Sequence, residues 1–160
     1  MSIDLIKQAL NYDPETGSFY WLVNRGRSAQ IGSVAGAIHS RGYRTIKVNG
    51  KQFYAHRLAW LMSVGDILDV IEVDHIDGDK LNNKLSNLRA VTKSVNQQNK
   101  RKPLRNNTSG FLGVSRSGIG WKAEILVNNK RLNLGTFVKP ENAYEAYLKA
   151  KRQHHEGCTI

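Results

Sequence analysis

The chain has 160 residues, with 24 lysines and arginines against 13 aspartates and glutamates, and a formal net charge of +11. This length fits one domain or two small ones, and the positive surplus favours binding to a phosphate backbone. The longest apolar stretches, such as residues 58–62, are far shorter than the roughly 20 residues of a membrane-spanning helix, and no signal peptide is expected. The single cysteine, Cys158, excludes an internal disulfide and a multi-cysteine zinc site, which fits a reducing, cytoplasmic compartment.

The chain before residue 70 reads as short elements separated by turns. Ser2 suits the N-cap of a first helix, and Pro14 and Gly17 mark the turn that follows it. Asn49-Gly50 is a strong signal for a two-residue hairpin, and Gly65 ends an apolar helix. The expected elements are a helix at 2–10, strands at 19–23, 43–48 and 51–54, and a helix at 56–64.

Residues 71–99 are the most informative stretch, and they predict a strand, a polar loop, a second strand and a helix. Asp74 and His75 are adjacent, so on an extended strand their side chains would point to opposite faces. They can converge on one phosphate only if the strand ends there and the chain turns. The following Asp77-Gly78-Asp79 provides such a turn.

These side chains suit the hydrolysis of a phosphodiester. The reaction needs a water that loses a proton, an in-line attack, and stabilisation of the leaving 3′ oxygen. A histidine can act as the base near neutral pH, and hard oxygen ligands can hold Mg²⁺ together with waters and the substrate phosphate. Asn96 lies about one turn into the expected helix, from where its amide oxygen could reach the same metal.

The stretch DHIDGDKLNNKLSNLRAVTKSVNQQN, residues 74–99, resembles the HNH motif of phage and intron-encoded homing endonucleases. The resemblance implies that Asp74 and Asn96 bind the metal and that His75 is the general base. It also implies that Asn87 hydrogen-bonds across the ββα loop and holds its shape. Because asparagine stands at position 96, where many members of the family have histidine, we expect Mg²⁺ or Mn²⁺ rather than zinc.

The resemblance extends upstream, through Tyr12-x-Pro-x-Thr-Gly and His56-Arg-Leu-Ala-Trp60, to nearly all of residues 1–100. His56 could be a second catalytic residue, although a histidine bonded locally at a helix start is the commoner case. A calcium loop is the other interpretation of the acidic stretch. Its spacing would require an aspartate in place of Val73 and a glutamate in place of Lys84, which argues against it.

The C-terminal part is more basic per residue than the rest. Residues 1–100 carry 13 basic and 9 acidic side chains, whereas residues 101–160 carry 11 and 4. A basic, polar run from Lys100, broken by Pro103, is typical of a linker, and the tail from His154 is expected to fray. Between them we expect strands at 113–115, 121–127 and 131–134, a turn at Asn128-Asn129, and a helix opened by Pro140.

Residues 109–152 resemble the ethylene-response-factor (APETALA-type) DNA-binding domain, which also occurs in phage homing endonucleases. The residues that carry the resemblance are Gly113-Val114-x-Arg116, Trp121-Lys122-Ala123-Glu124-Ile125 and Leu134-Gly135-Thr136-Phe137. The resemblance implies a three-stranded sheet that enters the major groove, which is ~12 Å wide and admits a β-ribbon, with the helix packed behind it.

Eight residues are expected to contact DNA. Arginine suits guanine edges or phosphates, and tryptophan can stack on sugars or bases. For Trp121 the alternative is a packed core residue, and for the linker a solvated tether. The expected contacts are Arg116, Trp121, Lys122 and Arg131 on the sheet, and Lys100, Arg101, Lys102 and Arg105 in the linker.

Together these features predict an α+β protein with a ββα-metal (HNH) nuclease domain at 1–100, a basic linker at 101–109, and a three-stranded antiparallel sheet plus helix at 110–160. We expect a homing-type endonuclease that nicks double-stranded DNA site-specifically with one Mg²⁺ or Mn²⁺ ion. We expect a monomer in a bacterial cytoplasm, with no membrane association and no obligate protein partner. A non-catalytic DNA-binding regulator is the main alternative, and an RNA-binding protein, which would need stacking platforms for single strands, is the second.

Overall fold

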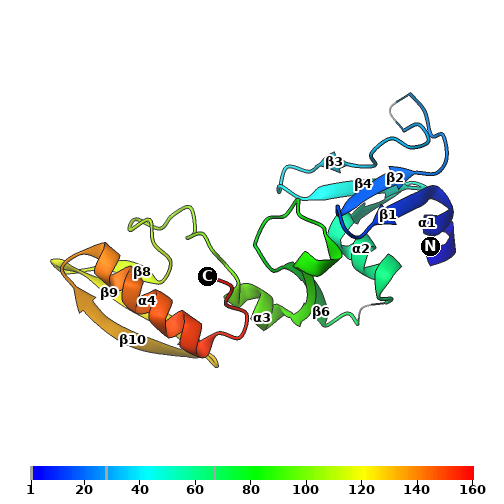
Figure 1. The fold of residues 1–160 in the computed structure, drawn as a ribbon. Helices are drawn as coiled ribbons and strands as arrows, with labels where there is room; N and C mark the ends of the chain where they lie inside the picture. Colours follow the sequence, from blue (N-terminus) through cyan, green and yellow to red (C-terminus); the bar gives the residue numbers. More distant parts are fainter. Residues whose placement is uncertain (1, 28, 67) are drawn as a thin grey trace. The chain divides into compact units, whose positions relative to one another are not determined.

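The computed structural model describes residues 2–27, 29–66 and 68–160, which form two compact units, 1–93 and 94–160 (Figure 1). The positions of the two units relative to one another are not determined. The division falls after Lys93, the first residue of α3 (Lys93–Gln98), earlier than the boundary expected near residue 100. Among the described residues, no helix combines the length and apolar character needed to cross a membrane.

The first unit opens with α1 (Ile3–Ala9) and a short hairpin. The Ser2 side chain caps the helix by accepting a hydrogen bond from the Asp4 backbone, which confirms the predicted N-cap. The chain then turns extended, and β1 (Leu10–Asp13) pairs antiparallel with β2 (Ser18–Trp21). Strand β1 was not predicted, because Leu10 continues the apolar pattern of the helix although its backbone is already extended.

A three-stranded antiparallel sheet follows, in the order β3 (Ala37–Ile38), β4 (Arg44–Val48) and β5 (Lys51–Tyr54). The turn between β4 and β5 has positive φ at both Asn49 and Gly50, which confirms the predicted hairpin. From β5 the chain enters α2 (Ala55–Ser63) directly.

The end of the first unit is a two-stranded ribbon with a loop between its strands. Strand β6 (Ile71–His75) pairs antiparallel with β7 (Leu88–Thr92), and the short 3₁₀ helix η1 (Leu85–Asn87) leads into β7. The ribbon rests on the core of the unit through Val73 and Leu88. The other large side chains of that core are Ile6, Leu10, Tyr12, Phe19, Trp21, Ile46, Val48 and Leu58.

The second unit contains a three-stranded antiparallel meander with a helix on one face. Its strands are β8 (Val114–Ser117), β9 (Gly120–Val127) and β10 (Lys130–Phe137), with β9 in the centre, and the helix is α4 (Pro140–His154). Asn128 and Asn129 both have positive φ in the predicted turn. The helix packs through Ala143, Tyr147 and Ala150 onto Val114, Ala123 and Ile125.

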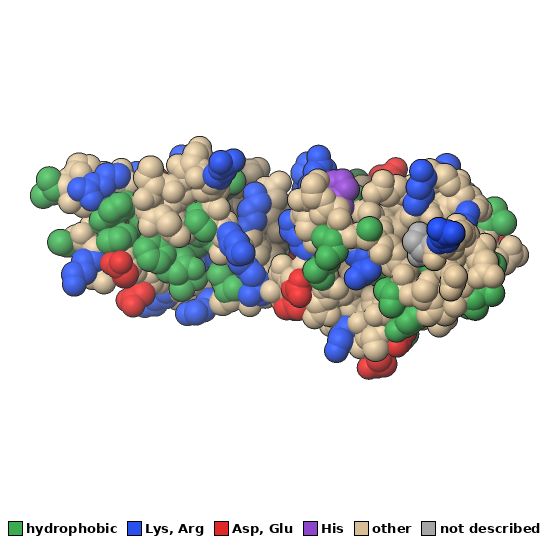
Figure 2. All heavy atoms as spheres, turned by 90° about the horizontal axis from the view of Figure 1, so that it is seen from above, with side chains coloured by type: hydrophobic (Ala, Val, Ile, Leu, Met, Phe, Trp, Pro, Cys, Tyr) green, Lys and Arg blue, Asp and Glu red, His purple; other side chains and the backbone are tan. Residues whose placement is uncertain are grey.

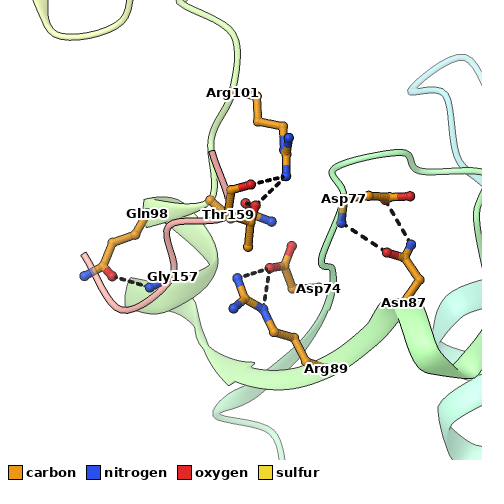
Figure 3. A network of polar contacts seen from close by, with 9 residues as sticks. Asp74, Asp77, Asn87, Arg89, Gln98, Arg101, Gly157 and Thr159 are labelled. Atoms are coloured by element: carbon orange, nitrogen blue, oxygen red, sulfur yellow. Dashed lines mark hydrogen bonds and ion pairs between the residues drawn. The ribbon is translucent and has the colours of Figure 1, made fainter. Parts of the chain in front are cut away.

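The tail after α4 is held in place, so the expectation that it frays was wrong. The Gly157 backbone N–H donates to the Gln98 side chain at 3.0 Å, and the Arg101 guanidinium donates to the Thr159 carbonyl at 3.1 Å (Figure 3). The Thr159 hydroxyl also bonds the Asn99 side chain. We call this set, Gly157 and Thr159 with Gln98, Asn99 and Arg101, the C-terminal clasp. It ties the end of α3 and the first linker residues into the second unit.

Gly157 is required in the clasp by close approach. A Cβ at this position would lie 2.1 Å from the Val95 carbonyl oxygen on α3, which is far inside van der Waals contact. Close to the clasp, the buried Lys151 side chain donates to the Lys100 carbonyl at 2.6 Å, and burial lowers the pKa of that amine. The start of the predicted linker is therefore anchored rather than a solvated tether.

Candidate active site

Asp74 and His75 occupy the last two positions of β6, and both are buried, with 8% and 5% of their surface exposed. Their ladder partners on β7 are Arg89 and Leu88. The chain turns directly after His75, where Gly78 has a φ of 76° and its N–H donates to the His75 carbonyl at 3.0 Å. The strand therefore ends where the sequence required it to end.

Asp74 forms an ion pair across the ribbon. The Nε and Nη2 atoms of Arg89 both donate to Oδ2 of Asp74, at 3.1 and 2.9 Å (Figure 3). An arginine fork orients a carboxylate more tightly than a single contact does, because two bonds from one planar group restrict its rotation. Arg89 on β7 therefore contributes to fixing the orientation of the Asp74 carboxylate.

Asn87 braces the loop between the two strands, which is the placement that the HNH resemblance implies for it. Its Oδ1 accepts a hydrogen bond from the Asp77 backbone at 3.1 Å, and its Nδ2 donates to Asp77 Oδ1 at 2.9 Å (Figure 3). Nδ2 also donates to the Asn82 carbonyl at 2.8 Å. Burial alone would raise the pKa of Asp77, but hydrogen bonds from Asn82, Asp79 and Asn87 outweigh it and lower that pKa. The loop is therefore closed around a charged carboxylate.

Asn83 lies under His75 and is almost fully buried, with 1% of its surface exposed. Its Oδ1 is 3.1 Å from His75 Nε2, and its Nδ2 donates to the Leu81 carbonyl at 3.1 Å. The Tyr12 hydroxyl donates to the Asn83 carbonyl at 2.8 Å. Because burial raises the pKa of Tyr12 to about 12, this hydroxyl keeps its proton and remains a donor.

Besides Asn83, His56 also contacts the His75 side chain. It is buried at the second position of α2, and its ring meets the His75 ring edge to face with centroids 5.0 Å apart. The Tyr43 ring lies 5.3 Å from His56 and 6.1 Å from His75. Burial, with smaller contributions from His75 and Arg57, lowers the pKa of His56 to about 3, so its imidazole is neutral. Its Nδ1 makes no hydrogen bond within the described part of the chain, unlike the locally bonded histidine that the sequence suggested.

The Asp74 carboxylate offers oxygen atoms, which suit a hard divalent cation better than they suit a structural zinc site built from cysteine and histidine. Within the described residues, no group of three or more His, Cys, Asp or Glu side chains could hold a metal ion. One carboxylate is sufficient for Mg²⁺, which keeps several waters and takes further oxygens from a phosphate. Asn96, the other expected ligand, lies on α3 in the second unit, so its position relative to Asp74 is undetermined and its role remains a prediction.

The four sheet residues expected on DNA fall on two faces. Along β9, Ala123 and Ile125 are buried under α4, and Trp121 packs against the same core. Arg116 pairs with Trp121 across the strands and places its guanidinium 4.9 Å from that ring. These two residues therefore lie on the helix-side face, and Trp121 fits its alternative interpretation as a packing residue.

Lys122 and Arg131 lie on the opposite face of the sheet, which α4 leaves open. Strand alternation puts Lys122, Glu124 and Leu126 on this side, and Arg131 pairs with Leu126. Lys122 also forms a 2.6 Å ion pair with Glu124. We call this side of β8, β9 and β10 the open face. The two faces were not distinguished in the prediction, although the alternation of apolar and polar residues along β9 indicates them.

The linker cations also divide into two groups. Lys100, Lys102 and Arg105 are exposed, whereas Arg101 is partly buried in the C-terminal clasp. In the space-filling view, lysine and arginine side chains are scattered over the visible face of each unit (Figure 2). The exposed linker cations remain candidates for backbone contacts, and Arg101 is engaged inside its own unit.

Several residues that shape this site were not singled out from sequence. Arg89 could have been found from its place opposite Asp74 once the ribbon register is known. Asn83 gave only a weak signal, as the second residue of Asn82-Asn83 within a polar loop. The Tyr12 motif pointed to the family but not to a contact with the loop between β6 and β7.

Comparison with known proteins agrees with this geometry. A family model described as HNH endonuclease matches residues 53–98, from β5 to the end of α3. Protein 3.8 of Escherichia phage T7 is 36% identical over 89 residues, which cover 52% of this chain and 73% of that protein. DNA endonuclease I-HmuI of Bacillus phage SP01 is 28% identical over 131 residues, covering 69% of this chain and 68% of that protein.

Among solved structures, one described as DNA binding and cleavage by the HNH homing endonuclease I-HmuI matches at 31% identity with a TM-score of 0.43. That match covers 56% of this chain, and the chain spans half the length of that structure. The family match ends at residue 98 and does not reach the sheet of the second unit, so the ethylene-response-factor resemblance is not supported by it. The match across the Asp74–His75 ribbon, together with the phage T7 relative, shows that the chain belongs to the HNH endonuclease family.

Proposed function

We propose that this protein is a metal-dependent DNA endonuclease of the homing type, with His75 as its general base. The observation that carries the proposal is the placement of Asp74 and His75 together at the buried end of β6, where the chain turns into the loop braced by Asn87. The phage SP01 relative is named a DNA endonuclease, which supports DNA as the substrate.

In this proposal each site residue has one task. His75 accepts the proton of the attacking water at a ring nitrogen, and Asn87 keeps the loop closed so that His75 is presented at a fixed angle. Asp74 and Asn96 would hold one Mg²⁺ or Mn²⁺ ion, and such an ion would supply stabilisation of negative charge on the phosphate and on the leaving 3′ oxygen. The Arg89 fork orients the Asp74 carboxylate through Oδ2.

We assign site preference to the second unit. The open face carries Lys122 and Arg131 on the side of the sheet that α4 does not cover, and a β-sheet can enter the major groove. The resemblance of residues 109–152 to the ethylene-response-factor domain supports the same assignment. The exposed linker residues Lys100, Lys102 and Arg105 would follow the phosphate backbone.

The chemistry is tested with the full chain and supercoiled plasmid. Cleavage should require Mg²⁺ or Mn²⁺ and stop when EDTA is added. The His75→Ala protein should bind DNA as well as the unmodified protein does but fail to cut it, because the base is not needed for docking. Asp74→Ala should also lose Mn²⁺ binding in calorimetry. Full cleavage by the His75→Ala protein would refute the assignment of the base.

We further propose that the protein acts as a monomer and nicks one strand. One active site can cleave a phosphodiester in a strand of only one polarity at a time. Because the strands of a duplex are antiparallel, cutting both of them needs a second active site or a reorientation of the protein on the DNA. Plasmid that carries a sequence selected for cleavage from a random library should pass through open circles before any linear form appears. Linear DNA without an open-circle stage would mean that two sites act together.

A further inference from the structure

The contact between Asn83 and His75 fixes which ring nitrogen carries the proton. The Asn83 amide N–H₂ donates to the Leu81 carbonyl, so the amide oxygen is the atom that faces His75 Nε2 at 3.1 Å. An amide oxygen can only accept a hydrogen bond. Nε2 must therefore be the protonated nitrogen of the neutral imidazole, which leaves the lone pair on Nδ1.

The Asn83 backbone, from which this side chain extends, is held by the N-terminal hairpin. The Tyr12 hydroxyl donates to the Asn83 backbone carbonyl at 2.8 Å, and the Asn83 backbone N–H donates to the Leu81 carbonyl at 3.0 Å. On the hairpin side, Gly17 has a φ of 73° and packs so closely that a Cβ there would lie 2.4 Å from the Lys84 backbone nitrogen. The turn between β1 and β2 thus supports the backbone at Asn83 directly.

We propose that Asn83, held by Tyr12, is a positioning residue that selects the Nε2–H tautomer of His75. This inference rests on the proposed role of His75 as general base and adds the group that prepares it. With the proton confined to Nε2, Nδ1 is the nitrogen that takes the proton from water. A histidine in the wrong tautomer has no lone pair at the position where the base must act.

A purely structural role for Asn83 makes different predictions from a positioning role. If Asn83 only filled space, its loss would weaken the loop and lower DNA binding and turnover together. If it selects the tautomer, its loss lowers kcat while KM stays near its original value, because docking of DNA does not depend on the ring proton. An acceptor of similar size at position 83 should then restore kcat.

The test uses the full chain and its Asn83→Ala, Asn83→Asp and Tyr12→Phe variants. Asn11→Ala is the matched control, since the exposed Asn11 side chain makes no hydrogen bond within the described residues. Two-bond ¹H–¹⁵N spectra of the imidazoles, recorded without metal where histidine is neutral, report the tautomer directly. The His75 signals are assigned by their absence in the His75→Ala protein.

We expect His75 in the unmodified protein to be the Nε2–H tautomer. The Asn83→Ala protein should show a mixture of tautomers, and its kcat should fall about tenfold or more at unchanged KM. A tenfold fall in kcat corresponds to an increase of about 1.4 kcal/mol in the activation free energy. Asn83→Asp keeps an acceptor oxygen at Nε2 and should recover the tautomer and most of kcat. Tyr12→Phe should lie between the unmodified protein and Asn83→Ala.

Two results would overturn the inference. One is His75 of the unmodified protein protonated on Nδ1, a result that needs no variant of Asn83 and holds even if Asn83→Ala fails to fold. The other is an Asn83→Ala protein that keeps both the Nε2–H signal and full kcat. Failure of the proposed function is distinct from both, since it appears as cleavage by the His75→Ala protein while the tautomer spectrum is unaffected.

Discussion

Replacing Asn87 by alanine should open the loop between β6 and β7. The change removes all three side-chain hydrogen bonds of Asn87, two to Asp77 and one to the Asn82 carbonyl. One of the partners is a carboxylate, so its bond is stronger than one between neutral groups. The alanine leaves the backbone bond from Ile76 N to the residue-87 carbonyl intact.

The cost can be worked from these contacts. Each hydrogen bond contributes about 0.5–1.5 kcal/mol net, so three amount to roughly 1.5–4.5 kcal/mol. Because Asn87 is only half-buried and Asp77 is exposed, water replaces part of the loss, and we expect about 2 kcal/mol. Since about 1.4 kcal/mol is a factor of ten, the opening equilibrium of the loop should rise about 30-fold.

Hydrogen exchange of the loop amides measures this opening. The informative donors are the N–H groups of Asp77, Asp79 and Leu81, which are bonded to side-chain oxygens inside the loop. Their exchange should be about 30-fold faster in Asn87→Ala, whereas the amides of β4 and the Asn11→Ala control should be unchanged. Loop exchange at the unmodified rate in Asn87→Ala would refute the bracing role of this side chain.

Three further predictions concern His56, the open face and the C-terminal clasp. Burial holds the pKa of His56 in the folded state at about 3, below its unfolded value of ~6.5. The contribution of His56 to stability is therefore present at neutral pH and declines as the pH falls from about 6.5 towards 3. In denaturant unfolding, the first unit should be less stable by about 2 kcal/mol at pH 5 than at pH 7, and the His56→Phe protein should lack this loss. If Lys122 and Arg131 each neutralise a phosphate, the slope of the logarithm of DNA affinity against the logarithm of salt concentration should become shallower in the double variant Lys122→Gln, Arg131→Gln, by about 0.9 for each of these two phosphates. Arg116→Gln, on the helix-side face, should leave that slope unchanged. Gly157→Val should disrupt the C-terminal clasp by forcing its Cβ against the Val95 carbonyl, destabilising the second unit by about 1–3 kcal/mol, and faster exchange at residues 156–160 would report it.

Local turn chemistry accounts for the parts of the fold that the sequence predicted well. The hairpin at Asn49-Gly50 and the turn at Asn128-Asn129 both need residues that tolerate positive φ, and these residues stand at the right positions between alternating strands. The Ser2 cap and the start of the helix at Pro140 could likewise be predicted, because both depend on residues within a single helical turn. The reversal after His75 was visible in Asp77-Gly78-Asp79.

Contacts between distant segments could not be predicted in this way. The bond from Tyr12 to Asn83 joins residues 71 apart, and neither neighbourhood reveals the other. Strand β1 was hidden because Leu10 fits the apolar pattern of α1. The tail was expected to fray because a short polar stretch has no apolar pattern of its own, whereas its order comes from hydrogen bonds to Gln98 and Asn99 at the end of α3. The residues implied by the HNH resemblance were located by the motif, but the side chains that orient them were not.

The C-terminal clasp also bears on how such a chain could be recombined with its relatives. The family match ends at residue 98, and a simple exchange of nuclease segments would join two parents at that point. The structure places Gln98 and Gly157, 59 residues apart, in direct contact, with a glycine that tolerates no larger side chain against α3. A chimera joined there would pair the helix of one parent with the tail of another. Functional recombinants should therefore inherit α3 and residues 157–160 from the same parent.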